Sequence, residues 1–179
     1  EFPFPVAEVV TMGRFPYLGR FEKLTRRDRE IVDEALDWTQ THHLRDRPIS
    51  QLSSGERQRV LIARAVAQKP AILMLDEPNV HLDLNHQIAI FRLLRRLNQD
   101  FSVTVVVVLH DLTAAAVFCQ TVALMWEGEL VKTGPPQEVI TTEILRSVYG
   151  ADIEVYPSPL GGIPQVAYQA EQTHKPQTP

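Results

Sequence analysis

The sequence predicts an α/β fold in which short apolar strands alternate with helices around a parallel sheet. Residues 71–75 and 103–109 are short apolar runs, and the second is nearly all β-branched. Such a run is typical of a strand that is buried on both faces of a parallel sheet. The segment 84–98 lies between the two runs and carries apolar residues at helical spacing. This strand–helix–strand order favours a parallel sheet.

Cap and turn residues predict where the other elements begin and end. Thr25 and Ser53 each precede an acidic residue by three positions, which is the capping-box pattern, and they predict helices that run to about residues 40 and 68. We also expect a short helix at 6–12 that Gly13 and Pro16 break, helices at 112–119, 137–140 and 142–149, and strands at 121–126, 130–133, 152–156 and 166–168. The polar stretch 169–179 predicts a disordered tail.

Composition excludes several classes of protein. The chain has 179 residues, of which 44% are hydrophobic and 22% are charged, as in an ordinary globular domain. A net charge of −4 gives no general basic excess for binding nucleic acid. The single cysteine, Cys119, excludes an internal disulfide framework. The longest apolar run is far shorter than the roughly 20 residues that a membrane-spanning helix needs.

Two surface features have both a plain and a functional interpretation. Between residues 13 and 29 lies a basic cluster, which consists of Arg14, Arg20, Lys23, Arg26, Arg27 and Arg29. A solvated face is favoured, and a surface that meets a partner or the membrane interface is the alternative. The pair His42–His43 favours a surface loop over a metal site, because no further ligand shares its spacing.

The start of the predicted helix at residue 53 is the first candidate site. A helix N-terminus offers free N–H groups and partial positive charge, which suit a phosphate. Ser53 and Ser54 add hydroxyl donors, Gly55 permits a close backbone approach, and Glu56 completes the capping box. A plain capping box explains the same residues without any ligand.

Polar residues at the ends of the two predicted parallel strands form the second candidate site. Asp76 and Glu77 follow the first strand, where Asp76 can hold Mg²⁺ and Glu77 can orient or deprotonate a water. His110 follows the second strand, where it can hydrogen-bond a phosphate oxygen or the attacking water. Between them, Asp83 either caps the next helix or takes part in the site.

Four segments in order resemble the ATP-binding cassette (ABC) ATPases of transporters. They are LSSGERQR at 52–59 (the signature motif), ILMLDEP at 72–78 (Walker B and the catalytic glutamate), NVHLD at 79–83 (the D-loop) and LHD at 109–111 (the H-loop). The resemblance covers residues 6–156. The flanking segments 8–18 and 144–150 look like those of iron-siderophore, haem and cobalamin importers.

The resemblance implies a P-loop NTPase-like parallel-sheet core with a helical subdomain. It places most of the helical subdomain at 1–52, the C-terminal part of the RecA-like core with the signature helix at 53–156, and a terminal strand and tail at 157–179. It also implies binding of ATP and Mg²⁺, a homodimer with a second ATPase subunit, and a transmembrane permease on whose cytoplasmic side the protein lies. A periplasmic or lipoprotein substrate-binding protein is an indirect partner, and nucleic acid is not one.

Roles for individual residues follow from the same resemblance. Ser53, Ser54, Gly55 and Glu56 contact ATP held by the opposite subunit. Asp76 supports Mg²⁺ through water, and Glu77 is the general base. His110 contacts the γ-phosphate, and the loop of Asp83 crosses the dimer interface. Two positions depart from the family pattern: Ser54 replaces the usual glycine, and Asn79–Val80 replaces small hydroxyl residues.

The phosphate-binding loop is not found in these residues. No G-x-x-x-x-G-K followed by Ser or Thr occurs among the 179 residues. We therefore expect a chain without the N-terminal strands of the ATPase, which binds ATP poorly alone while its parent protein hydrolyses ATP. Two alternatives stay open: a catalytically incompetent interaction module, and a non-transport ABC ATPase. Only 22 residues separate Ser53 from Asp76, which leaves no room for the long insertions of non-transport members.

Overall fold

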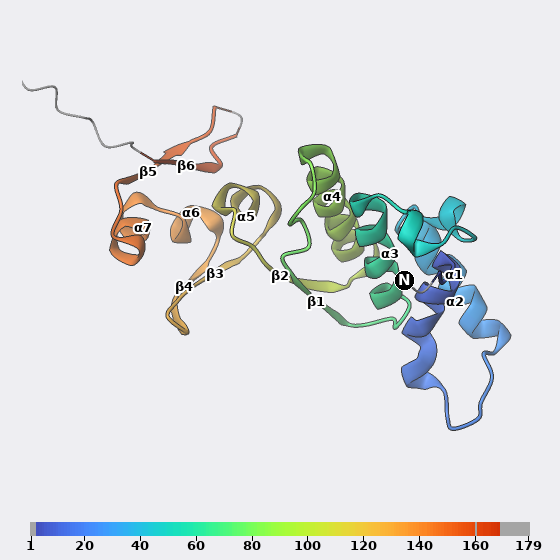
Figure 1. Ribbon diagram of the computed structural model, residues 1–179. Coiled ribbons are helices and arrows are strands. Elements are labelled where there is room, and N and C mark those ends of the chain that lie inside the picture. The colour runs from blue at the N-terminus through green and yellow to red at the C-terminus, as the bar shows by residue number, and fades with distance from the viewer. Residues whose placement is uncertain (1–2, 160, 169–179) are drawn as a thin grey trace, which may run out of the picture. The chain divides into compact units, whose positions relative to one another are not determined.

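The computed structural model describes residues 3–159 and 161–168, which form two compact units that divide between Val108 and Leu109 (Figure 1). The first unit contains the helices α1 (Val6–Thr11), α2 (Arg26–Trp38), α3 (Ser54–Val66) and α4 (Leu84–Phe101), the 3-10 helices η1 (Met12–Tyr17), η2 (His42–Leu44) and η3 (Ile49–Gln51), and the strands β1 (Ile72–Asp76) and β2 (Thr104–Val108). Every described helix is too short or too polar to cross a membrane.

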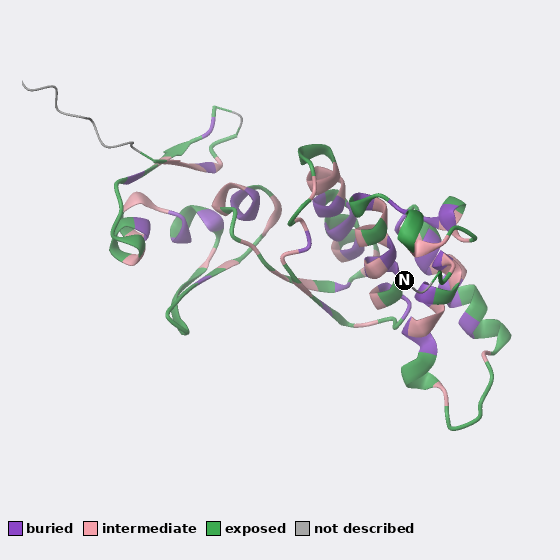
Figure 2. Cartoon of the chain, in the orientation of Figure 1, coloured by how far each residue is buried: buried purple, intermediate pink, exposed green. Residues whose placement is uncertain are grey.

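One hydrophobic core holds the first unit together. The fully buried side chains of Leu36 on α2, Val60 and Ile62 on α3, and Leu97 on α4 belong to it, and Figure 2 shows buried residues along the facing sides of these helices. Leu73 on β1 packs against the same core. The helices and the sheet of this unit therefore share one apolar interior.

Both predicted capping boxes are confirmed. The Thr25 hydroxyl accepts the Asp28 backbone N–H at 3.2 Å, and the Ser53 hydroxyl accepts that of Glu56 at 3.3 Å. In each case the acidic side chain also accepts the backbone N–H of the cap residue. The boxes satisfy backbone donors that a helix start otherwise leaves unpaired. The helices α2 and α3 thus begin where the sequence predicts and end two residues earlier, at Trp38 and Val66.

The α-helix α1 ends at Thr11, close to the predicted end, but helical turns continue past Gly13, contrary to the prediction. The helix α1 continues into η1, which includes both Gly13 and Pro16. A Cβ atom built on Gly13 would lie 2.2 Å from the Arg64 carbonyl oxygen of α3. The glycine is therefore present because two helices approach each other closely there, and not because the chain turns.

The predicted parallel strand pair is confirmed, with Asp76 opposite Val108 in the register. The prediction that both faces of this sheet are buried is wrong. Leu73 is buried, whereas Ile72 and Met74 are 58% and 75% exposed and Val106 and Val108 are about half exposed. Alternate residues point to opposite faces of a strand, so one face of this sheet packs on the helices. Within the described residues of the first unit, the other face carries exposed apolar residues, and Figure 2 shows exposed positions in green along β1 and β2.

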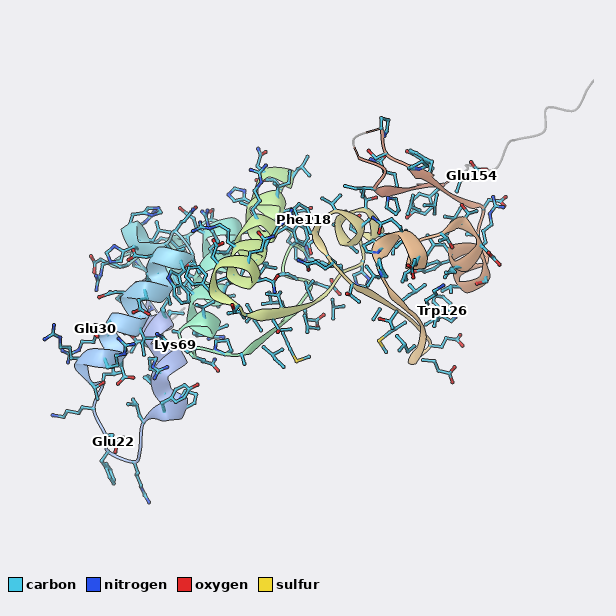
Figure 3. All side chains as sticks on the ribbon, turned by 180° about the vertical axis from the view of Figure 1, so that it is seen from behind. Glu22, Glu30, Lys69, Phe118, Trp126 and Glu154 are labelled. Carbon is cyan, nitrogen blue, oxygen red and sulfur yellow. The ribbon has the colours of Figure 1, made fainter. Side chains whose placement is uncertain are left out.

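The second unit has its own smaller core. It contains α5 (Leu112–Phe118), the antiparallel pair β3 (Val122–Trp126) and β4 (Glu129–Gly134), α6 (Pro136–Val139), α7 (Thr142–Tyr149), and the antiparallel pair β5 (Ile153–Pro157) and β6 (Pro164–Tyr168). Leu124, Val139 and Leu145 are buried together. Trp126, labelled in Figure 3, meets the edge of Tyr149 at 5.3 Å between ring centroids. The tail predicted at 169–179 lies outside the described residues, and the domain boundaries stay predictions.

Candidate functional site

The first turn of α3 presents the signature residues at an exposed helix N-terminus. Ser53 and Ser54 are exposed, and Gly55 is buried. The Glu56 carboxylate accepts both the backbone N–H and the hydroxyl of Ser53, each at 2.8 Å. The Ser53 hydroxyl is therefore engaged inside the capping box, so it must leave Glu56 before it can donate to a phosphate.

The negative charge of Glu56 at this helix end is stabilised by neighbouring groups of the same chain. Hydrogen bonds from the backbone and then the hydroxyl of Ser53 hold the pKa of Glu56 below its ordinary value, with smaller contributions from Arg47 and Arg59. Glu56 is thus an anion at neutral pH whose oxygens point back to Ser53. The remaining N–H groups of the first turn, together with the helix dipole, still favour an anion in front of α3.

The D-loop residue Asp83 lies at the start of α4, where it makes two contacts with one neighbour. Its carboxylate accepts the backbone N–H of His86 at 2.9 Å and the His86 Nδ1 at 2.7 Å. These bonds, the backbone one first, lower the pKa of Asp83. A carboxylate only accepts hydrogen bonds, so Nδ1 is the donor in this contact.

The His86 ring also lies against Gly55, which brings the D-loop and the signature helix together. A Cβ atom built on Gly55 would lie 2.1 Å from His86 Cδ2, 2.6 Å from Cγ and 2.9 Å from Nε2. Only a residue without a side chain fits at this point. The structure therefore joins Gly55 to Asp83 through one imidazole ring.

The two consecutive acidic residues end the strand β1. Asp76 is exposed at the last position of the strand and Glu77 is partly buried after it. Glu77 donates its backbone N–H to the Val108 carbonyl at 3.2 Å, and its φ of 45° is in the left-handed region, which is uncommon outside glycine. Strained backbone conformations of this kind often occur at functional sites.

The chemistry of Asp76 fits a magnesium ion that is held partly by water and phosphate. Among the described residues, no group of three or more His, Cys, Asp or Glu side chains could hold a metal ion. Mg²⁺ in nucleotide sites commonly uses only one or two carboxylates, and water and phosphate oxygens complete its shell. One exposed carboxylate at a strand end meets that need. His110 is exposed two positions beyond Val108 and belongs to the second unit.

Two residues make contacts that the sequence did not predict, His86 with Asp83 and Arg14 with Asp28. His86 stands three positions after Asp83, a spacing that lets a side chain reach back to a cap residue, and this was the available signal. Arg14 was assigned to the basic surface cluster, but it is buried and bonded to Asp28 at 3.0 Å and to the Ala67 carbonyl at 2.8 Å. Other members stay at the surface, where Arg26 and Arg27 pair with Glu30 (Figure 3).

Comparisons with known proteins agree with this arrangement. The sequence model of the ABC transporter family matches residues 5–80. The iron(3+)-hydroxamate import ATP-binding protein FhuC of Bacillus subtilis is 43% identical over 154 residues, which is 86% of this chain and 57% of FhuC. Other relatives are ATP-binding proteins for enterobactin, hemin and cobalamin import. The match covers 57–59% of the length of the hydroxamate, enterobactin and hemin relatives and 43% of the length of the cobalamin relative.

Solved structures show the same likeness. An inward-facing metal-chelate type ABC transporter has a TM-score of 0.87 at 28% identity, over 95% of this chain and 68% of that one. A dimeric ATP-binding cassette, MJ0796 bound to ADP and Pi, has a TM-score of 0.61 at 31% identity, over 75% of this chain and 58% of that one. The motif order, the parallel strand pair and these matches show that the chain belongs to the ABC transporter family.

Proposed function

We propose that this chain is part of the ATP-hydrolysing subunit of an ABC importer for a metal chelate, such as an iron-siderophore, haem or cobalamin. The observation that carries the proposal is the joint placement of Gly55, at an exposed helix N-terminus, and Asp83 through His86. The consecutive acids Asp76 and Glu77 at the end of β1 supply the second half of the chemistry. The relatives' names and the metal-chelate type transporter support the substrate class.

The signature helix acts on a nucleotide that a second subunit holds. Backbone N–H groups at the start of α3 donate to the γ-phosphate, and the Ser53 hydroxyl turns from Glu56 to the same phosphate. Because the backbone N–H groups are held in place by the helix and its core, they need little reorganisation when charge develops on the phosphate, whereas the Ser53 hydroxyl must first leave Glu56. The likeness to a dimeric cassette supports the homodimer that this arrangement needs.

The strand end supplies the water chemistry. Glu77 orients the attacking water and takes its proton. The role of His110, which is to donate to a phosphate oxygen, is proposed from the resemblance of residues 109–111 to the H-loop. Asp76 would hold Mg²⁺ through water, and that ion would neutralise charge on the phosphates. Phosphoryl transfer depends mostly on such positioning and charge stabilisation. Ser54 and Glu56 are proposed to contact the same nucleotide at the start of α3.

The partners and location of the protein follow from this activity. A transmembrane permease receives the work of ATP hydrolysis, so the ATPase lies at the cytoplasmic face of the membrane. A periplasmic or lipoprotein substrate-binding protein delivers the chelate and acts on this subunit only through the permease. Uptake of a radiolabelled iron chelate by the reconstituted transporter tests the substrate class.

The decisive experiment replaces Glu77 by glutamine in the assembled transporter. Loss of a general base is expected to lower the ATP turnover number by about 10²- to 10⁴-fold, while ATP binding persists. Glu127→Gln is the matched control, because Glu127 is exposed and has a φ of 49°, close to the 45° of Glu77. Equal turnover in the two variants would contradict the assigned role.

The 179 residues alone are proposed to bind MgATP weakly, because no P-loop pattern supplies a cradle of backbone N–H groups and a lysine. Isothermal titration of the isolated chain is expected to show no binding at micromolar concentrations. Micromolar binding would contradict this proposal. If the assembled complex hydrolyses no ATP at all, the alternative of an interaction module replaces the ATPase.

A further inference from the structure

We infer that His86 is a positioning residue that couples the D-loop to the signature helix. The proposal rests on the proposed function, because both motifs act there on a nucleotide at the subunit interface. Its structural basis is a single chain of contacts, from the Asp83 carboxylate through the imidazole ring to the Cα of Gly55.

The ring is held firmly on the D-loop side. The Asp83 carboxylate accepts two hydrogen bonds from His86, one from its backbone N–H at 2.9 Å and one from Nδ1 at 2.7 Å. The backbone bond also caps α4, an 18-residue helix whose inner face, including Leu97, is in the hydrophobic core. A displacement of Asp83 must therefore move the ring or break a short charge-assisted hydrogen bond.

The ring is equally confined on the α3 side. Atoms Cδ2, Cγ and Nε2 of His86 all lie within 3.0 Å of the position that a Cβ atom on Gly55 would occupy. The ring thus occupies the space that a side chain would fill. The side chain of His86 is 38% exposed, and its packed face is the one against Gly55. A displacement directed along that face is passed to the backbone of α3, because close-packed atoms leave no space to absorb it.

The consequence is that the two motifs move as one body. In a dimer, a shift of the D-loop on subunit contact carries the first turn of α3 with it, so the phosphate donors reach the nucleotide together with the D-loop. His86 touches neither substrate nor metal in this scheme. Its imidazole sets the distance between two elements that do.

The coupling is tested first in the chain itself, by following the Gly55 amide signal in a ¹⁵N-labelled sample. Asp83→Ser keeps a side-chain oxygen that can cap α4 but removes the carboxylate that holds Nδ1. We expect this substitution to shift the Gly55 signal, and to leave it in place when His86 is already alanine. An equal shift in both backgrounds, or no shift in either, overturns the proposal.

The functional arm measures ATP hydrolysis by the assembled transporter. His86→Ala is expected to lower kcat by about 10- to 100-fold, as small misplacements of positioned groups do, with little change in KM for ATP. His86→Asn restores much of the loss, because its amide can donate to Asp83 in place of Nδ1. His43→Ala is the control. Because His43 is exposed on η2, we expect this substitution to leave the turnover number unchanged.

The outcomes separate the two proposals. A wild-type turnover number in His86→Ala, or an Asn variant as slow as the Ala variant, overturns the positioning role. A wild-type transporter without ATPase activity overturns the proposed function instead, and the amide experiment then decides the contact by itself.

Discussion

Gly55→Ala is the substitution whose effect the structure predicts most sharply. In an open helix, alanine stabilises by about 1 kcal/mol relative to glycine. Here the new methyl group would lie 2.1 Å from His86 Cδ2, so the ring must move or the helix must shift. Overpacking of this kind costs about 1–3 kcal/mol. We therefore expect Gly55→Ala to lower the free energy of unfolding by about 1–3 kcal/mol in the wild-type background.

Removal of the ring should reverse this effect. In a His86→Ala background the obstacle is gone, so Gly55→Ala is expected to be neutral or to stabilise by up to about 1 kcal/mol. Urea unfolding of the four chains measures the coupling energy, which we expect to be about 1–3 kcal/mol. His43→Ala provides the matched background, in which Gly55→Ala keeps its full cost. The same cost in all backgrounds would refute the packing argument.

Three further substitutions test the fold. Gly13→Ala places a methyl group 2.2 Å from a backbone oxygen of α3 and is expected to destabilise by about 1–3 kcal/mol in urea unfolding, whereas Gly19→Ala meets only a flexible exposed side chain and should change little. Hydrogen bonds from Thr25, and then one from the buried Arg14, lower the pKa of Asp28 from 3.8 to about 2. The ionised form therefore contributes stability that is present above pH 3.8 and is lost as the pH falls toward 2; the unfolding free energy of Asp28→Asn should vary less than that of wild type across this window. Leu97→Ala removes a fully buried side chain and is expected to cost about 2–5 kcal/mol by the same assay, and a cost under about 1 kcal/mol would contradict its place in the core.

Features that depend on neighbouring residues in the chain could be predicted from the sequence. The capping boxes at Thr25 and Ser53 are confirmed because cap and partner are three positions apart, so local hydrogen bonds decide them. The parallel pairing of β1 and β2 also follows from local order, since a helix between two apolar strands places them side by side.

Features that depend on distant neighbours could not be predicted. Gly13 looks like a helix breaker in sequence, but the carbonyl of Arg64 on another helix explains it. Arg14 looks like a surface charge until the Asp28 carboxylate and the Ala67 carbonyl are placed around it. The exposed face of β1 and β2 is another such case, because apolar composition alone does not show which face is covered.

Some features of the candidate site could likewise be predicted from the sequence, and others could not. Motif order located Ser53, Asp76, Glu77 and Asp83, since each stands at a strand or helix end that the sequence already indicates. The imidazole between Gly55 and Asp83 became visible only when α3 and α4 were packed together, because 30 residues separate Gly55 from His86.

The central proposal is that this chain is part of a subunit that drives uptake of a metal chelate by hydrolysing ATP. The most direct measurement is ATP-dependent accumulation of a labelled iron chelate in proteoliposomes that contain the assembled transporter, with Glu77→Gln and Glu127→Gln compared side by side. We predict that accumulation is lost with Glu77→Gln and retained with Glu127→Gln. Undiminished accumulation with Glu77→Gln would contradict the account.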